Sequence, residues 1–285
     1  MAKRSTAVVD QRGQVLEAEH QVLPVYSLVK PMIASLVFTN GIDLTARVSR
    51  WFDGSWVTRG GDITVGQLLN HTSGLCDYGH LPAYGAAIEA GRAPWSDEEF
   101  AEHTLRQPLL FEPGGGFAYS NAGYWLLREI ACREAGLTFD ALLHRDVTEP
   151  LGMGDTRVVQ GQFADDLPAY GSGWVWHGLV VATALDMVRF MRSTLVAPLR
   201  QGLVAAGPPE SPWVNPHYGR GLMVEPGVCY GHNGQGPGYG AACFHFEQPR
   251  LTGCVLTAAR DLDAPPFAAL SELVARRAGE QQRRR

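Results

Sequence analysis

Ser27 and Lys30 are the side chains in this sequence whose types and spacing are best suited to chemistry. Three residues is about one turn of a helix, so a helix through this segment places the lysine amine beside the serine hydroxyl. Burial disfavours the charged form of lysine and lowers its pKa, after which the neutral amine can accept the serine proton. The pair therefore predicts a serine nucleophile that forms an acyl-enzyme.

Lysine is rare in this chain, which gives Lys30 added weight. Of 24 basic residues only Lys3 and Lys30 are lysines, and all the others are arginines. A guanidinium stays charged under ordinary protein conditions, whereas a lysine can lose its proton near neutral pH. A lysine kept against this bias suggests a proton acceptor. The plainer interpretation is a surface lysine that arginine happened not to replace.

The residues that follow predict the helix that this pairing needs. Apolar residues recur at helical spacing as far as Val37, and Asn40-Gly41 is a typical helix end. Pro31 fits a helix only in its first turn, where a missing N–H costs little. Ser27 is therefore expected at the helix N-terminus, whose free N–H groups and partial positive charge favour a developing oxyanion.

Two further segments present polar side chains in glycine-rich surroundings. Tyr119 and Asn121 follow the loop-forming run 111–116, which can hold them at a cleft. The phenol can shuttle protons there, although a half-buried, hydrogen-bonded tyrosine is the plainer interpretation. His232 lies in the run 231–240, where alternating glycines weaken a strand unless something approaches its backbone closely. A ligand is the natural candidate for that approach.

In this order, Ser27-x-x-Lys30, Tyr119-x-Asn121 and His232-x-Gly234 resemble the three motifs of the serine β-lactamase and penicillin-binding-protein superfamily. The pattern is most similar to its class C β-lactamase, esterase and D-aminopeptidase branch. The further stretches that agree with this resemblance are 68–75, 119–124, 150–156 and 183–186. The resemblance covers most of residues 7–260 and implies a β-lactamase/transpeptidase-like fold.

The resemblance also implies catalytic roles. Ser27 would be the nucleophile, and Lys30 and Tyr119 would share the general acid and base work, with the first proton acceptor left open between them. The backbone N–H groups of Ser27 and Gln235 would form the oxyanion hole, which contributes several kcal/mol in the transition state when well aimed. No metal or organic cofactor is expected.

Substrate contacts are implied at other positions. Asn121 would bind the acyl-side amide or carbonyl of the substrate. The strand containing His232 and Gly234 would line the opposite wall, with His232 tuning the proton network or binding a polar end. Trp174 and Trp176 lie where such proteins often place a substrate-side loop and could form a flat aromatic wall, although two nearby tryptophans are more often core or rim residues.

Periodicity along the chain predicts strands at both ends and helices between them. The predicted strands and helices are a hairpin over 7–16, a helix over 124–135 ending at Gly136, a capped helix over 183–191, a hairpin over 241–258 and a helix from Pro265-Pro266. We therefore predict an α/β (α+β) protein. Its antiparallel sheet is built from both chain ends (1–60 and 165–285) and flanked by helices, its inserted all-helical subdomain spans 61–164, and its active site lies in the cleft between the two.

Composition excludes several classes of partner. The chain has 285 residues, a net charge of −5 and no basic stripe interleaved with aromatics, so nucleic acid is not expected. No apolar run approaches the ~18 residues of a membrane span, and without an apolar leader a cytoplasmic location is expected. The five cysteines are odd in number and lack a C-x-x-C pair, which argues against a disulfide framework or a zinc site.

Several functions remain compatible with this sequence. The first is transfer of an acyl group from a small-molecule ester or amide through Ser27 to an amine or alcohol, and hydrolysis by water is close behind. A β-lactamase, D-amino-acid peptidase or DD-carboxypeptidase ranks lower, because those substrates are met outside the cytoplasm. A non-catalytic binding module is a further alternative, but all the motif residues are present. An α/β-hydrolase needs a G-x-S-x-G elbow, which no serine here has.

Overall fold

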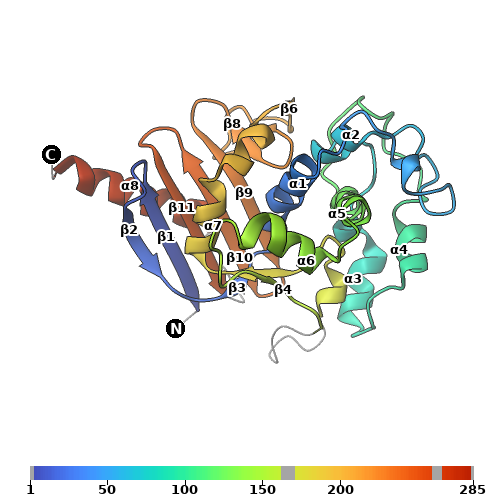
Figure 1. The fold of residues 1–285 in the computed structure, drawn as a ribbon, viewed down its shortest axis with the longest axis horizontal. Helices are drawn as coiled ribbons and strands as arrows, with labels where there is room; N and C mark the ends of the chain where they lie inside the picture. Colours follow the sequence, from blue (N-terminus) through green and yellow to red (C-terminus); the bar gives the residue numbers. More distant parts are fainter. Residues whose placement is uncertain (1–2, 162–170, 259–264, 284–285) are drawn as a thin grey trace.

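Both ends of the chain contribute to one eight-stranded antiparallel sheet (Figure 1). We describe it in a computed structural model that covers residues 3–161, 171–258 and 265–283. The strand order is β2-β1-β11-β10-β9-β8-β7-β6. The strand bounds, in chain order, are β1 Arg4–Asp10, β2 Val15–Glu19, β6 Val204–Ala205, β7 His217–Tyr218, β8 Met223–Glu225, β9 Cys229–Gly236, β10 Tyr239–Phe246 and β11 Leu251–Ala258.

Pairing of β1 with β11 joins the two chain ends. Arg4 lies opposite Thr257 and Asp10 lies opposite Leu251, so the N-terminal strand extends the C-terminal hairpin. Both hairpins predicted from the sequence are present, and their strands are longer than predicted. The prediction of an antiparallel sheet built from both ends and flanked by helices is therefore confirmed.

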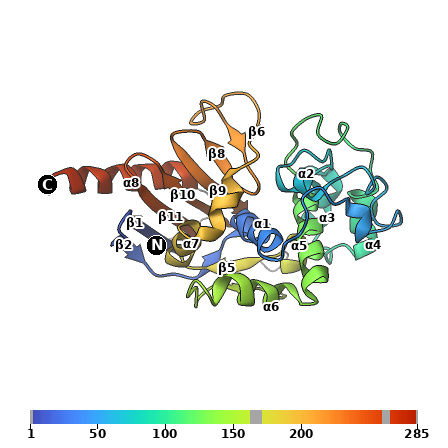
Figure 2. The ribbon, with the colours of Figure 1, turned by 45° about the horizontal axis from the view of Figure 1, so that its top comes forward.

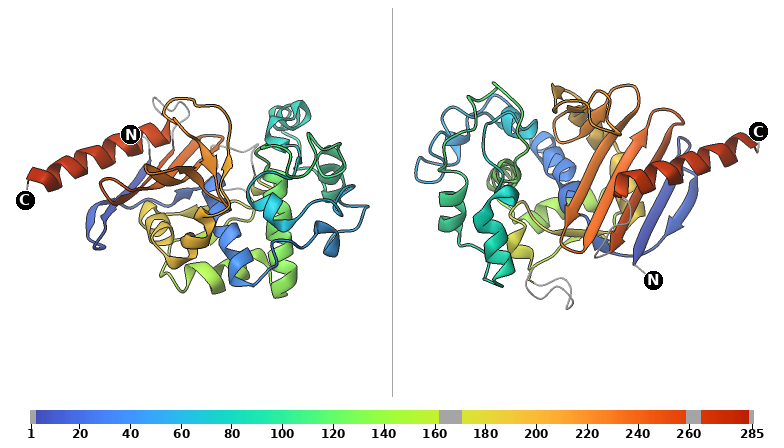
Figure 3. Two further views of the ribbon diagram at one scale, coloured as in Figure 1. Left: turned by 90° about the horizontal axis from the view of Figure 1, so that it is seen from above. Right: turned by 180° about the vertical axis from the view of Figure 1, so that it is seen from behind.

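The sheet buries both of its faces under helices. Helix α8 (Pro266–Arg283) crosses the back (Figure 3), where Gly253 lets it approach β11; a Cβ there would lie 2.7 Å from Leu270. Side chains of successive strand residues alternate between faces. Accordingly, Ala242 packs with α8, whereas Ala241 belongs to the larger core on the other face, which α7 covers.

Helix α7 (Ala184–Met191) begins at the threonine that the sequence predicted as its cap. Its predicted start is confirmed, because the Thr183 side chain accepts a hydrogen bond from the Asp186 N–H at 3.2 Å. The Asp186 carboxylate binds Arg189 at 2.7 Å and the Thr156 hydroxyl at 3.0 Å. The carboxylate thereby ties α7 to Thr156, which lies 30 residues before Asp186 in the sequence.

A group of helices lies beside the sheet (Figures 1 and 2). The bounds of these helices are α2 Val65–Leu69, α3 Pro82–Glu89, α4 Asp97–His103, α5 Asn121–Ala135 and α6 Phe139–Leu143. Helix α5 begins three residues before the predicted start and ends at Gly136 with φ 65°, as expected. The predicted subdomain boundary at 164–165 lies outside the described residues. In the described part of the chain, no helix combines the length and apolar character that crossing a membrane requires.

A three-stranded sheet, β3-β5-β4, leads the chain toward the sequence-predicted site. Its strands are β3 Leu23–Pro24, β4 Arg157–Val158 and β5 Val180–Ala182. Just after β3, a 3₁₀ turn spans Tyr26–Leu28 and leads directly into α1 (Val29–Thr39). Pro31 lies in the first turn of α1, and Gly41 follows the helix at φ 63°, as predicted.

Candidate active site

Helix α1 carries Lys30 between the sheet and α5 (Figure 2), and the 3₁₀ turn before it carries Ser27. Every residue of α1 from Val29 to Val37 is buried, because the helix is enclosed on all sides. Ser27, in the turn just before it, is half-buried. The sequence thus produces a buried amine one turn after a partly accessible hydroxyl.

Tyr26, immediately before the serine, has a strained backbone. Its φ is +44°, a left-handed conformation that a bulky residue seldom adopts. Its ring packs on Gly236 of β9, where a Cβ would lie 2.1 Å from Tyr26 Cε1, and its hydroxyl donates to the Pro237 carbonyl at 3.3 Å. These contacts hold the strained turn in place and so set the direction in which Ser27 points.

Gly234 brings the β9 backbone against the same turn. A Cβ at this position would lie 2.3 Å from the Val25 carbonyl oxygen and 3.2 Å from the Ser27 nitrogen. At Gly234, the group that approaches the strand closely is therefore the chain leading into Ser27, and not the ligand that the sequence suggested. Gln235, the next residue, has an exposed side chain, and its role as an oxyanion donor stays a prediction.

Lys30 is fully buried and touches Ser27. Its Nζ lies 2.8 Å from Ser27 Oγ and 2.6 Å from Asn121 Oδ1. Burial lowers the pKa of Lys30 to about 7, although the negative charge of Asp77 raises it in part. Near neutral pH the amine is therefore present in both its charged and neutral forms, so it can accept a proton from the hydroxyl that it contacts.

Asp77 orients Asn121, and Asp77 was not among the site residues predicted from the sequence. Its carboxylate accepts hydrogen bonds from Asn121 Nδ2 at 2.9 and 3.1 Å and from the Asn121 backbone N–H at 3.1 Å. Because an ionised carboxylate only accepts, the amide nitrogen faces Asp77 and the amide oxygen faces Lys30. Only 8% of the Asp77 side chain is exposed. A signal was available, since Asp77 comes two residues after the stretch 68–75 that carried the resemblance.

Tyr119 is half-buried and lies beside the same pair of residues. Lys30 Nζ is 5.0 Å from the centre of the Tyr119 ring. Burial raises the pKa of Tyr119 well above its usual range, and a hydrogen bond with Ser27 opposes this rise. The phenol is therefore protonated at neutral pH and can donate a proton more readily than it can accept one.

His232 is buried and neutral. Burial and the charge of Lys30 lower the pKa of His232 to about 3. Its Nδ1 faces the Asn233 carbonyl oxygen, which only accepts, so Nδ1 carries the proton. Its Nε2 accepts from the Tyr218 hydroxyl at 3.0 Å. Both nitrogens are therefore engaged by the protein, and the structure gives His232 a place in the polar network beside Tyr119.

His177 is a further side chain in contact with Lys30. Its Nε2 lies 3.4 Å from Lys30 Nζ, and its Nδ1 lies 3.2 Å from the Tyr78 hydroxyl. Burial, together with the charge of Lys30, lowers the pKa of His177 well below its usual value. A neutral imidazole can accept a hydrogen bond from the lysine without adding a second positive charge. The sequence did not assign His177 to the proton network, because 147 residues separate it from Lys30.

The structure corrects the expectation of an aromatic substrate wall at Trp174 and Trp176. Only 1% of Trp174 and 9% of Trp176 is exposed. Trp176 stacks on Phe100 with ring centres 4.0 Å apart, and Trp174 packs edge-on against Tyr84 and Trp95. The two rings are core residues that support the loop carrying His177, so they do not form a substrate wall.

A small, mainly apolar cavity opens beside Tyr119. Its volume is about 210 Å³. The residues that line it include Phe117, Tyr119, Trp213, Tyr218, Met223 and Glu210. A cavity that combines aromatic walls with a carboxylate suits a small organic group better than an inorganic ion.

The arrangement of serine, buried amine and phenol can now be compared with known proteins. The model of the β-lactamase family matches residues 3–275. The chain belongs to the β-lactamase family. Membership makes it an enzyme of the serine-hydrolase type, in agreement with the expectation from the three motifs.

Solved structures share the β-lactamase-like fold over nearly the whole chain. A D-stereospecific amidohydrolase from Streptomyces sp. superposes with a TM-score of 0.76 at 20% identity, covering 90% of this chain and 89% of its own. The D-amino acid amidase from Ochrobactrum anthropi SV3 gives a TM-score of 0.76 at 21% identity, covering 99% of this chain and 94% of its own.

A curated relative from Bacillus subtilis is similar to part of the sequence. Penicillin-binding protein 4* of Bacillus subtilis (strain 168) is 30% identical over 133 residues, which is 46% of this chain. The match spans 28% of the length of that relative. The solved structures are therefore similar to this chain in fold, and the penicillin-binding protein is similar to part of its sequence.

Proposed function

We propose that this protein forms an acyl-enzyme on Ser27 from a small-molecule amide or ester. The observation that carries the proposal is the contact of 2.8 Å between Ser27 Oγ and a buried Lys30 amine whose pKa is about 7. An alcohol is a weak nucleophile until a neighbouring base takes its proton. Lys30 is that base, because it is the group in contact with Ser27 that is partly deprotonated at neutral pH.

Tyr119 acts as the proton donor, whereas Lys30 acts as the proton acceptor. As Ser27 Oγ bonds to the carbonyl carbon, its proton passes to Lys30 and the oxyanion is bound by the N–H groups of Ser27 and Gln235. The leaving amine or alcohol then takes the proton of the Tyr119 hydroxyl as its bond to carbon breaks. Return of a proton from Lys30 to Tyr119 restores both groups, so acylation needs no proton from solvent.

Asn121 and Asp77 stabilise the lysinium ion that forms in this step. The amide oxygen of Asn121 accepts from Lys30 at 2.6 Å, and the Asp77 carboxylate fixes that oxygen in place. The oxygen has a second lone pair, with which Asn121 can also bind an amide N–H of the substrate. We therefore assign Asn121 a positioning role first and a substrate contact second.

The cavity beside Tyr119 indicates the kind of substrate. Phe117, Trp213 and Tyr218 favour an apolar side chain, and Glu210 suits an ammonium group. Two of the similar solved proteins are described as a D-amino acid amidase and a D-stereospecific amidohydrolase. An amino acid amide with an apolar side chain is therefore the substrate class that we propose.

The acceptor that removes the acyl group from Ser27 decides whether the enzyme is a hydrolase or a transferase. Water makes it an amidohydrolase or esterase, and a bound amine or alcohol makes it a transacylase. A β-lactamase or D-peptidase activity would use the same acyl-Ser27 and remains the alternative for a cell-wall peptide or β-lactam substrate.

Covalent labelling tests the proposal. A fluorophosphonate should add to Ser27, as located by peptide mass spectrometry, and Ser27→Ala should abolish the adduct. Ser35→Ala is the matched control, because Ser35 lies on α1, the helix that follows Ser27, but is buried and donates to the Met32 carbonyl. An adduct on another residue, or none in the folded wild type, would reject the nucleophile and favour a binding module. Discharge of the trapped acyl-enzyme by water or by added amines separates hydrolysis from transfer.

A further inference from the structure

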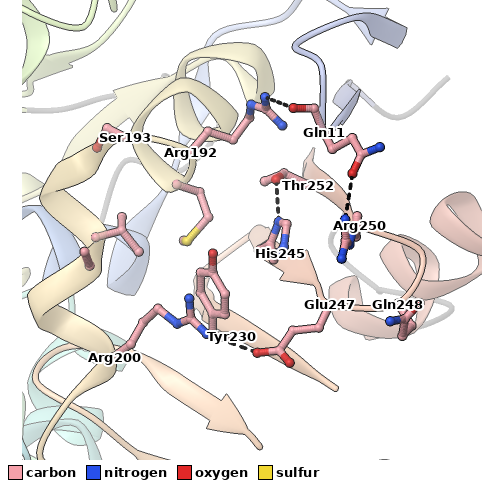
Figure 4. Close-up of a pocket in the computed structure, with 13 residues that line it drawn as sticks. Gln11, Arg192, Ser193, Arg200, Tyr230, His245, Glu247, Gln248, Arg250 and Thr252 are labelled. Atoms are coloured by element: carbon pink, nitrogen blue, oxygen red, sulfur yellow. Dashed lines mark hydrogen bonds and ion pairs between the residues drawn. The ribbon is translucent and has the colours of Figure 1, made fainter. Parts of the chain in front are cut away.

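A second cavity lies away from Ser27, on the side of the sheet that α7 covers (Figure 4). Its volume is about 570 Å³. Tyr230, His245 and Thr252 form part of its lining from three neighbouring strands, because Tyr230 is opposite His245 and His245 is opposite Thr252 in the sheet register. The remaining lining comes from the end of α7, the 3₁₀ segment after it and the turns 10–13 and 247–250. We call this cavity the arginine pocket.

Arginines dominate the charge of the arginine pocket. Its lining includes Arg192, Arg200 and Arg250 against a single carboxylate, Glu247, which leaves a net of two positive charges. The whole chain carries a net charge of −5. The pocket is therefore locally cationic on a protein that is anionic overall, and it attracts anions out of proportion to that overall charge.

Two of these guanidinium groups are hydrogen-bonded but not neutralised. Arg192 donates to the carbonyl oxygens of Asp10 at 2.6 Å and Gln11 at 3.5 Å, and Arg250 donates to the Gln11 side chain at 3.3 Å. Among the described residues, neither has a carboxylate within ion-pair distance. Their charges are held in place by neutral oxygens, and further N–H donors on each remain for a ligand.

Arg200 is paired, but it also shapes the lining. It lies 3.1 Å from Glu247 and 4.0 Å above the ring of Tyr230 (Figure 4). His245 donates to or accepts from the Thr252 hydroxyl at 2.9 Å. Burial lowers the pKa of His245, and the charges of Arg200 and Arg192 lower it further. The two guanidinium charges therefore act directly on the pocket floor.

Arg250 occupies a backbone position that favours other residues. Its φ is +64°, in the left-handed region where glycine or asparagine is least strained. An arginine at such a position stabilises the turn less than glycine or asparagine would. Its side chain lines the pocket instead, which gives it a use that the turn itself does not explain.

We propose that the arginine pocket binds a small organic dianion, such as a phosphate monoester or a dicarboxylate. Guanidinium groups recognise both by paired, charge-assisted hydrogen bonds. Two uncompensated positive charges match a dianion in number, and about 570 Å³ is larger than an inorganic ion needs. The neutral hydrogen-bonding groups of Tyr230, Thr252 and Gln248 suit the hydroxyls of a small metabolite.

Binding is tested on the full chain with named probes. Glucose 6-phosphate and malate represent the two ligand chemistries, inorganic phosphate tests the charge alone, and glucose and sodium chloride at equal ionic strength are controls. Calorimetry gives Kd, and the ring NMR signals of His245 report its pKa. A bound dianion adjacent to His245 should raise that pKa saturably, whereas sodium chloride at the same ionic strength should not reproduce the rise.

Variants complete the test. Arg250→Asn removes the charge and suits the left-handed backbone, so it should fold and weaken binding about tenfold or more. Arg4→Gln, on an exposed residue of β1, should leave Kd unchanged. The His245 signals of the wild type give an answer even if Arg250→Asn folds poorly. Saturable binding of either organic anion supports the proposal and identifies its chemistry. Shifts that follow ionic strength alone, or equal affinity in Arg250→Asn, would overturn it.

Discussion

Asp77 holds Asn121 by two nitrogens at once, accepting from the backbone N–H at 3.1 Å and from Nδ2 at 2.9 Å. The amide oxygen is thereby aimed at Lys30, 2.6 Å away. Through Asn121, the Asp77 carboxylate thus sets the surroundings of the proposed base. The first prediction follows from this relationship.

Asp77→Asn should lower the pKa of Lys30 below about 7, because the charge of Asp77 raises it in the wild type. The pH at which acylation reaches half its maximum should move down accordingly. Acylation should also slow, since the replacement amide no longer fixes the orientation of Asn121. The measurement is the rate of fluorophosphonate labelling against pH, with Asp43→Asn, an exposed carboxylate, as the control. An unchanged midpoint would remove Asp77 from the proton network.

Lys30→Arg should abolish acylation although the positive charge is kept, because a guanidinium does not give up its proton. Loss of a general base typically costs about 10²–10⁴ in rate. In the wild type the labelling rate should rise with pH through about 7, as the neutral amine becomes more populated. Lys3→Arg changes the other lysine of the chain and should be silent. A labelled, active Lys30→Arg enzyme would contradict the assignment of the base.

Gly234→Ala should disturb the turn that carries Ser27. The new Cβ would lie 2.3 Å from the Val25 carbonyl oxygen, so the backbone of β9 or of residues 25–27 must shift. Overpacking of this kind costs about 1–3 kcal/mol, and we expect a loss of acylation beyond the loss of stability. Urea denaturation and labelling measure the two effects separately. Gly54→Ala is the control, since nothing lies within 4 Å of its Cβ position.

His232 should make the protein less stable as the solution is acidified. Its pKa is lowered to about 3 in the folded state, so below the unfolded value of about 6.5 the unfolded chain binds one more proton. The free energy of unfolding then falls as pH drops, by up to about 1.4 kcal/mol per pH unit for this residue between pH 6.5 and 3. His232→Gln should flatten the profile by that slope. An identical profile in wild type and variant would show that His232 is not held neutral.

The local elements of this protein were predictable because each depends on neighbours in the sequence. The apolar runs of β10 and β11, the Thr183 cap of α7 and the position of Gly136 after α5 are all set by nearby residues in the sequence. The juxtaposition of Ser27 and Lys30 belongs with them, since three residues along a helix bring the two side chains together.

The sequence by itself determined which groups were available for chemistry and which of them share a turn. Only the tertiary structure decided that Lys30 loses its charge near neutral pH, that Asp77 aims Asn121, and that His177 reaches the amine from 147 residues away. It also placed Trp174 and Trp176 in the core. The physical reason is that solvation and electrostatic interactions depend on all the groups packed around a side chain, and the folded chain brings these together from distant segments.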